Sequence, residues 1–425
     1  MNESSPTIRI DQEALDDLVR KHAMFRAGKV GGRRASLINY DLTGLTLRGQ
    51  DMSHADFGGA VLAGADLRDA TLDYCSFFGA DLREANLLNA SMVRADLRGA
   101  VLRGAVMAGV DMTGADLRGG RMMAQAQDED GGGDISAKKS GDRATAESTT
   151  DFRGADLSGS KLSGVMAMNT NFQDANLAGS VMLRGNLRGA SLEGANLHGA
   201  DLSQADLRES NLRAAVMTEA KTESANLLDA DTKGALDAAA AGPTLAQLDK
   251  PFAERLKAHT LWVASEGMEG ERLDISGFDL RREPPFTRAL LAMIRGENSI
   301  WYGQDMLEVQ LQAADLRGAD LRQCNMIQAD LRGANLSGAQ LTGSHLQRAK
   351  LQPLKIGSRK AIASDLSGTS LRYADLSGAD LTGVNFAGAD LAHANLSNAD
   401  LRGANLQGAD MEAVNLEGTR MDGKR

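Results

Sequence analysis

The feature that most constrains the fold of this chain is a five-residue unit that recurs through most of its length. Residues 80–90 show it twice, as Ala-Asp-Leu-Arg-Glu followed by Ala-Asn-Leu-Leu-Asn. In an extended segment neighbouring side chains point to opposite faces, so Ala80 and Leu82 share one face and Asp81 points the other way. The two residues after each central Leu are polar or small, which suits a turn. Each unit therefore predicts a short strand and a corner, with one small and one large apolar side chain inside.

A period of five excludes a helix as the main structure. Five residues advance a helix by about 500°, so successive Leu residues would rotate by roughly 140° and cover the whole cylinder. A flat sheet of long strands needs unbroken alternation, which the corners interrupt. The fold class that remains is an all-β solenoid, in which each coil pairs in parallel with the next.

The repeated unit resembles the consensus of the pentapeptide repeat proteins, Ala-[Asp/Asn]-Leu-x-x. Residues 190–212 and 374–406 keep this pattern with few exceptions. The resemblance implies a right-handed quadrilateral parallel β-helix with four units per coil. The hand and the four-sided shape are taken from the resemblance, whereas the coil itself follows from the spacing.

Composition and charge narrow the class of protein. The net charge is −10, which argues against direct nucleic-acid binding through a basic surface. Cys75 and Cys324 both fall at the small inward position, so we expect buried, inert thiols. Two such thiols make no disulfide framework and fit a reducing compartment. The N-terminus reads as no secretory signal and no apolar run suits a membrane span, so we expect a cytoplasmic protein.

Residues 1–34 are predicted to form an N-terminal helical cap. Over residues 11–26, Leu15, His22 and Phe25 fall on one face of a helix, with Asp11 as its N-cap. The first coil of a solenoid exposes unpaired strand edges and an apolar end, so a lid is expected there.

The first β-helix module is predicted over residues 35–232, with one interruption. Residues 124–150 are polar, rich in glycine and nearly free of large apolar residues, so we expect a disordered loop. The units resume at Phe152 in the same numerical phase. The preserved phase favours a loop thrown out from one solenoid over a separate domain.

Residues 233–305 are predicted to be a helical linker and a second cap. One helix is expected with Asp249 as its N-cap and Pro251 in its first turn, and with Phe252, Leu256 and His259 on one face. A second helix is expected over residues 285–295, between Pro285 and Gly296. The second β-helix module is then expected over residues 306–425, with a bulging loop at the basic break of residues 352–360.

A longer repeat relates the two caps. His22 and Phe25 precede the first coils with the same His-x-x-aromatic spacing that His259 and Trp262 show before the later ones. Each His could be a ligand or a catalytic group. We favour a structural role, in which it packs against the aromatic ring and forms hydrogen bonds across the junction of helix and coil.

The sequence shows no catalytic apparatus. A solenoid core is filled by its own side chains, and catalysis needs groups that converge on a concave site. The chain contains no G-x-S-x-G, no G-x-G-x-x-G that opens a helix and no G-x-x-x-x-G-K-[ST]. Recurrent Asp-Leu-Arg triplets, such as Asp81 with Arg83 and Asp320 with Arg322, are interpreted as weak surface ion pairs. We therefore expect no enzyme, no cofactor and no metal.

One acidic stretch is a candidate interaction surface. From Asp375 to Glu417 the only cation is Arg402. With four units per coil, residues twenty apart lie on the same side, so Asp380 should stack with Asp400. Asp390 should likewise stack with Asp410. The candidate surface consists of Asp375, Asp380, Asp390, Asp400, Asp410 and Glu412.

Two functions of different kinds are compatible with these features. We expect a non-enzymatic scaffold that binds protein partners, whose identity the sequence does not give. The alternative, implied by the resemblance, is a DNA-mimicking protein that binds a topoisomerase such as gyrase through stacked carboxylates. Arginines interleaved with aspartates in the first block and the lack of an apolar C-terminal dimerisation element disfavour it. A hydrolase or ligase within residues 233–305 is weaker still, since that segment has no cluster of catalytic residue types.

Overall fold

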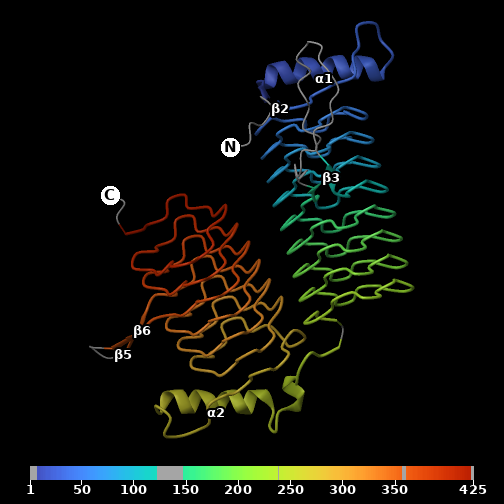
Figure 1. The fold of residues 1–425 in the computed structure, drawn as a ribbon. Coiled ribbons are helices and arrows are strands. Elements are labelled where there is room, and N and C mark those ends of the chain that lie inside the picture. Colours follow the sequence, from blue (N-terminus) through green and yellow to red (C-terminus); the bar gives the residue numbers. More distant parts are fainter. Residues whose placement is uncertain (1–6, 122–146, 238, 357–359, 423–425) are drawn as a thin grey trace, which may run out of the picture. The chain divides into compact units, whose positions relative to one another are not determined.

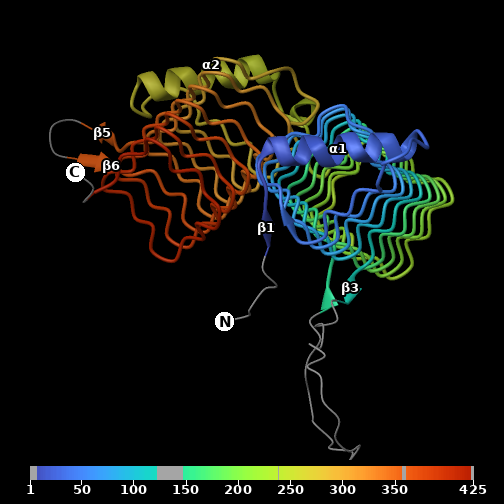
Figure 2. The same cartoon turned by 90° about the horizontal axis from the view of Figure 1, so that it is seen from above.

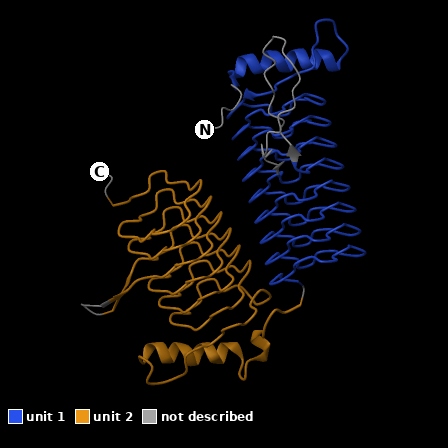
Figure 3. Ribbon diagram, in the orientation of Figure 1, with its two compact units in different colours: residues 1–238 blue, residues 239–425 orange. Residues whose placement is uncertain are grey.

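The computed structural model describes residues 7–121, 147–237, 239–356 and 360–422. The chain divides into two compact units, residues 1–238 and 239–425 (Figure 3), here called the N-terminal and C-terminal modules. Each module is a stack of coils with one α-helix at the end where the stack begins (Figure 1).

The coils repeat every twenty residues along the chain. Asp81 forms a parallel bridge with Val101, and most other bridges join residues at the same spacing. The Leu82 N–H donates to Val101 O at 2.7 Å, and the Asp81 N–H donates to Ala60 O at 2.9 Å, so each unit pairs with the coils on both sides. Twenty residues are four units, so each coil has four sides. The predicted parallel solenoid of pentapeptide units is confirmed.

The corners depend on the last residue of each unit. The Ala85 N–H donates to Leu82 O at 3.1 Å, which closes a turn over the two residues between them. Glu84 has a φ of 57° and Gly79, at the same position of the preceding unit, has a φ of 64°. This left-handed conformation costs a glycine least, which explains the frequent Gly at this position.

The interior is a continuous column of the small and large apolar residues. Ala80 and Leu82 are fully buried, and the rings of Phe57 and Phe77 stack with centroids 4.8 Å apart in successive coils. Cys75 is also buried and donates its S–H to Met52 O, and burial raises the pKa of this thiol to about 12. Cys324 is buried in the same way against Trp301 O, so both thiols lie at the predicted inward position.

Each module starts with a helix. In the N-terminal module, α1 (Gln12–Arg26) lies across the first coil (Figure 2), and the Asp11 side chain accepts from Ala14 N as its N-cap. Before it, β1 (Ile8–Arg9) pairs in parallel with β2 (Tyr40–Asp41). In the C-terminal module, a 3₁₀ turn (Leu245–Gln247) precedes α2 (Phe252–Ala264). The predicted Asp249 cap is wrong, because Pro251 is the N-cap of α2 and makes no side-chain hydrogen bond.

The helix predicted over residues 285–295 is also wrong. This segment is repeat coil, and bridges in the C-terminal module begin at Asp274, which pairs with Arg295. The coils therefore start well inside the range 233–305 that was predicted to be linker and cap. Buried Phe286, Leu291 and Trp301 keep the five-residue spacing here. Pro285 and Gly296 resemble the start and end signals of a helix, but in this context they belong to the coil.

Each module contains an insertion between its coils, after which the coils resume in the same register. In the N-terminal module Val101 bridges Asp151, and β3 (Gly120–Arg121) pairs antiparallel with β4 (Glu147–Ser148) at the base of the insertion. Most of the predicted disordered loop, 124–150, lies outside the described residues. In the C-terminal module β5 (Leu354–Ile356) and β6 (Lys360–Ile362) form an antiparallel hairpin where a bulging loop was predicted.

Candidate interaction surfaces

The structure divides the predicted acidic surface among three sides of the C-terminal module. Asp380 bridges Asp400 on one side, and Asp390 bridges Asp410 on another. Asp375 lies on a third side, where it bridges Asn395. The two predicted stacks therefore exist, but the six residues do not make one surface.

Most of these carboxylates are engaged by their own coils. Asp390 pairs with Arg372 at 3.1 Å, and Asp400 pairs with Arg402 at 2.6 Å and with Arg420 at 3.8 Å. The hydrogen bonds from Arg402 hold the pKa of Asp400 below its usual range. Arg372 and Arg420 lie just outside the stretch that was counted from the sequence, and only the coil register brings them back to it.

The remaining acidic residues differ in their exposure. Asp375 accepts from Gln347 and Asn395, and Asp380 accepts from the Thr382 hydroxyl at 2.7 Å. Asp410 and Glu412 are exposed in the last coil, where the Glu412 N–H donates to Asp410 at 2.9 Å. The exposed members of this acidic set therefore lie in the last coil of the C-terminal module.

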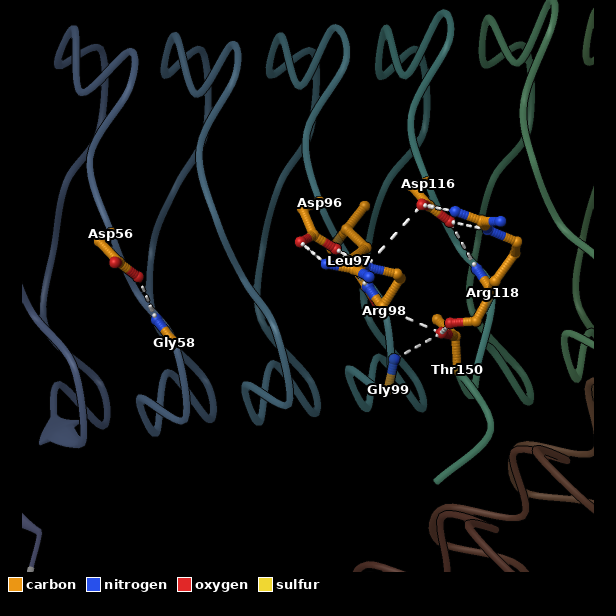
Figure 4. A network of polar contacts seen from close by, with 9 residues as sticks. All are labelled: Asp56, Gly58, Asp96, Leu97, Arg98, Gly99, Asp116, Arg118 and Thr150. Atoms are coloured by element: carbon orange, nitrogen blue, oxygen red, sulfur yellow. Dashed lines mark hydrogen bonds and ion pairs between the residues drawn. The ribbon is translucent and has the colours of Figure 1, made fainter. Parts of the chain in front are cut away.

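The Asp-Leu-Arg triplets form closed pairs within single units. The Arg98 guanidinium, for example, donates to both carboxylate oxygens of Asp96, at 2.8 and 2.7 Å (Figure 4). At least two triplets depart from the predicted surface pair, because Asp279 and Arg281 are buried as well as Asp320 and Arg322. The side chains of Asp320 and Arg322 are only 12% and 5% exposed, and the Arg322 guanidinium lies over the Tyr302 ring. That pair is part of the packed structure, because the neighbouring coils cover it.

The two cap histidines make equivalent contacts. His22 accepts from Ala35 N at its Nδ1 at 3.0 Å, and its Nε2 lies 3.2 Å from Ser53 O. His259 accepts from Leu273 N at 3.1 Å, and its Nε2 lies 2.8 Å from Ala292 O. Both rings are buried and bridge the helix to the first coil.

The aromatic partners of these histidines lie beside them. The Phe25 ring is 5.9 Å from that of His22 and the Trp262 ring is 6.0 Å from that of His259, measured between centroids. Phe25 is nevertheless 44% exposed, so it covers the histidine rather than filling the core. Both ring nitrogens of each histidine contact backbone groups, so these contacts agree with the structural role that we favoured.

A hydroxyl group clamps each insertion to the coil before it. Thr150 accepts from Gly99 N at 2.9 Å and its Oγ1 lies 3.2 Å from Leu97 O and 2.8 Å from Arg118 O (Figure 4). Ser364 follows the β5–β6 hairpin and does the same, accepting from Gly333 N at 2.8 Å and donating to Leu331 O at 3.1 Å. Sequence reasoning missed this clamp, since a buried Ser or Thr resembles any other small inward residue.

The insertions enter the two modules at similar depths. Four bridges lead from Ser36 to Asp116, after which the first insertion begins. Three bridges lead from Asp274 to Asn335, and the fourth, from Asn335 to Asp365, spans the second insertion. Each module thus repeats one plan, with a helix, a histidine bridge, several coils and a clamped insertion.

A site for chemistry is not apparent in the described parts of the chain. There, no group of three His, Cys, Asp or Glu residues could hold a metal ion. A shallow polar hollow of about 400 Å³ lies between α1 and the coil containing Thr46, and Gln12, Asp16 and Arg48 line it. Among the described residues, no helix is long and apolar enough to cross a membrane.

Comparison with known proteins identifies the repeat. The family model for pentapeptide repeats matches residues 33–69, 41–79, 51–89, 80–119, 170–208, 195–231, 310–351, 361–388 and 379–423, which together cover more than half of the chain. No curated protein matches the chain.

Solved structures of similar chains include two cyanobacterial proteins. A pentapeptide repeat protein from Cyanothece 51142 (Rfr23) is 24% identical and covers 33% of this chain and 90% of its own, with a TM-score of 0.24. HetL from Nostoc sp. strain PCC 7120, involved in the regulation of heterocyst differentiation, is 23% identical over 95% of this chain and 96% of its own, with a TM-score of 0.14. QnrB1, a plasmid-mediated fluoroquinolone resistance protein, is 17% identical over 53% and 97%, with a TM-score of 0.30. At these TM-scores the three structures add nothing to an argument about function.

Proposed function

Because the chain belongs to the pentapeptide repeat family, we propose that it is a non-enzymatic scaffold that binds protein partners. We take the right hand of the β-helix from the same family. The coils fill their own interior, so function rests on what their outer surface presents. The proposal also assigns the protein to a reducing compartment such as the cytoplasm, supported by its two free, buried thiols.

One observation carries this proposal, the clamped insertion that both modules share. Thr150 and Ser364 each use a buried hydroxyl to fix the point at which the chain returns to the coils after an insertion. A loop that merely interrupts the repeat would not need such a clamp. A fixed attachment point suits a binding surface, because it lowers the entropy lost when a partner docks.

The alternative is a DNA-mimicking protein that binds a topoisomerase. The stacking of Asp380 with Asp400 and of Asp390 with Asp410 favours it, because each stack repeats negative charge along its own side of the coils. Arg372, Arg402 and Arg420 weaken it, since they neutralise two of these four carboxylates. We therefore rank it second.

Affinity capture with the full-length protein, followed by reconstitution, tests the scaffold. We expect at least one captured protein to bind purified full-length chain in a stoichiometric complex by light scattering. Failure to reconstitute any captured protein would contradict the scaffold.

A gyrase supercoiling assay tests the alternative separately. The DNA mimic predicts that the full-length protein changes supercoiling and that Asp380→Lys with Asp410→Lys removes the effect. The matched control is Glu223→Lys, at an exposed position of the N-terminal module. No effect of the wild-type protein would rule out the mimic and leave the scaffold untouched.

A further inference from the structure

The β5–β6 hairpin, residues 354–356 with 360–362, differs from the coils that carry it in shape, and its chain segment is basic. It is an antiparallel pair attached to a solenoid whose own bridges are parallel. Both of its strands are edge strands, because no third strand covers either side among the described residues. Exposed edges of this kind offer backbone N–H and C=O groups to another chain.

One face of this hairpin is apolar and partly exposed. Leu354 pairs with Ile362, and Ile356 pairs with Lys360, so Leu354, Ile356 and Ile362 lie on the same face. Ile356 is 50% exposed and Ile362 is 40% exposed. Two half-exposed isoleucines at the edge of a sheet are unusual in a protein that protects its edges.

The base of the hairpin is held rigidly. Ser364 ties it to Gly333 and Leu331. Gly333 also has no room for a side chain, because a Cβ there would lie 2.9 Å from the Leu354 Cβ and 3.3 Å from the Ile362 Cβ. Pro353 packs in the same way, 3.3 Å from where a Cβ of Gly383 would lie. The hairpin is therefore anchored between the coil before it and the coil after it.

The chain segment that carries the hairpin is basic in a protein of net charge −10, although Asp330 and Asp380 lie in the coils on either side of Lys350. Residues 331–364 contain six Lys or Arg residues and no Asp or Glu. Three of the cations, Arg348, Lys350 and Lys355, are exposed. Arg332, by contrast, is paired with Asp330. Within the described ranges, none of the three exposed cations has an ion pair, so their charge is available to a partner.

We propose that the β5–β6 hairpin binds an acidic, aliphatic protein segment that adds to it as a third strand. This inference rests on the proposed scaffold function and names the kind of partner that one surface fits. Backbone pairing at a free edge supplies affinity, and the isoleucine face and the cations select aliphatic and acidic side chains. A nucleic acid would leave the isoleucines and the strand edge unused, and an anionic membrane would leave the edge unpaired.

Peptide binding to the full-length protein tests this docking site. The probe is a labelled nine-residue peptide of alternating Glu and Val, and binding is measured by fluorescence anisotropy. We expect it to bind, and we expect at least a tenfold loss when alternate peptide nitrogens are methylated, because methylation blocks pairing along one edge. A Lys-Val peptide of the same length should not bind.

Variants locate the site. Ile356→Asp and Lys355→Glu should each weaken Glu-Val peptide binding about tenfold or more without lowering the melting temperature, since both side chains are exposed. Lys257→Glu is the matched control, at an exposed position of α2, and should bind as the wild type does. Deleting residues 354–363 should abolish binding while it restores the twenty-residue spacing between the bridged Asn335 and Asp365, which are now thirty apart.

Several outcomes would overturn the proposal. These are binding that survives methylation of the peptide, binding unchanged in both hairpin variants, and binding only to an oligonucleotide or to phosphatidylglycerol vesicles. The scaffold function is judged independently. A captured partner that binds the 354–363 deletion as tightly as the wild type would refute the hairpin site and leave the scaffold standing. Binding of the Glu-Val peptide without any reconstituted protein partner would support the hairpin site and contradict the scaffold.

Discussion

At the scale of single residues, the cap histidines replace the missing coil. The first coil of a stack has no neighbour on its outer side, so some of its backbone groups lack partners. The His22 ring meets two of them, because Nδ1 accepts from Ala35 N and Nε2 lies within hydrogen-bond distance of Ser53 O. An acceptor at Nδ1 and a donor at Nε2 define one neutral tautomer. A protonated ring would point an N–H at the Ala35 N–H and lose that bond.

This bonding predicts that acid weakens both caps. Burial lowers the pKa of His22 and of His259 below the ordinary value of 6.5. Asp51 opposes this shift at His22 while Arg26 and Arg34 add to it, and Arg272 adds to it at His259. Between the folded and unfolded pKa values the unfolded chain binds more protons, so stability is lost as the pH falls below about 6.5.

Thermal melting between pH 7.5 and pH 5 checks the sign of this effect. We expect the melting temperature of the wild type to fall over this range. The fall should be smaller in His22→Asn with His259→Asn, although that variant should be less stable at pH 7.5. An equal fall in the wild type and the double variant would show that other groups govern the pH dependence.

The central Leu position gives a second prediction at this scale. Leu97 is fully buried, so Leu97→Lys places an unpaired charge in the apolar column. We expect the N-terminal module to lose at least about 3 kcal/mol of stability. Leu228→Lys is the control, since Leu228 is 63% exposed and the substitution should change stability by less than about 0.5 kcal/mol. Chemical denaturation followed by circular dichroism measures both, and similar losses would contradict the assignment of the column.

At the scale of elements, the segments with the most regular repeat were those whose structure the sequence predicted correctly. The alternation in residues 80–90 fixes which side chains point inward, and α1 has both an apolar face and an Asp11 cap. The helix prediction over residues 285–295 was wrong because Pro285 and Gly296 are strong local signals for the ends of a helix. The five-residue spacing of the buried Phe286 and Leu291 is a weaker signal. Local signals determine the secondary structure of a segment only where pairing with neighbouring coils does not override them.

The candidate surfaces were harder to predict than the coils. The stacking of Asp380 with Asp400 needs only the twenty-residue period, which the resemblance supplied. The pairing of Asp390 with Arg372 depends on how side chains cross between neighbouring coils. The Thr150 clamp depends on the loop returning to one coil after its insertion. Contacts of this kind follow from the stacked structure and leave no pattern in the sequence.

The clamp itself yields the third prediction. Thr150→Val keeps the shape of the side chain but removes the 2.9 Å hydrogen bond from the buried Gly99 N–H, which then keeps only its 3.3 Å bond to Arg118 O. The expected cost is that of one net hydrogen bond, about 0.5–1.5 kcal/mol of unfolding free energy. Ser160→Ala is the matched control, because the buried Ser160 hydroxyl has no hydrogen-bond partner in the described structure. Denaturant unfolding measures the loss of stability in both variants. Equal losses would mean that the hydrogen bonds of the Thr150 hydroxyl do not stabilise the module.

At the scale of the whole molecule, the chain consists of two units that each carry what a solenoid needs. Each has its own apolar column, its own helix at the first coil and its own histidine bridge. A cap in the middle of a chain has a purpose only if the coils that follow it begin a new stack. The position of α2 therefore argues that the C-terminal module is a second solenoid rather than a continuation of the first.

The two modules are accordingly expected to fold separately. Fragments 1–238 and 239–425, which are separated at the boundary between the two compact units in the sequence, should each show a cooperative melting transition. Calorimetry of the full-length chain should resolve into transitions at the temperatures of the two fragments. A third fragment, 273–425, keeps every coil of the C-terminal module but lacks α2 and His259. It should melt lower or self-associate, because its first coil then exposes unpaired edges. If it melted with fragment 239–425, α2 would be an appendage rather than the cap that starts the second stack.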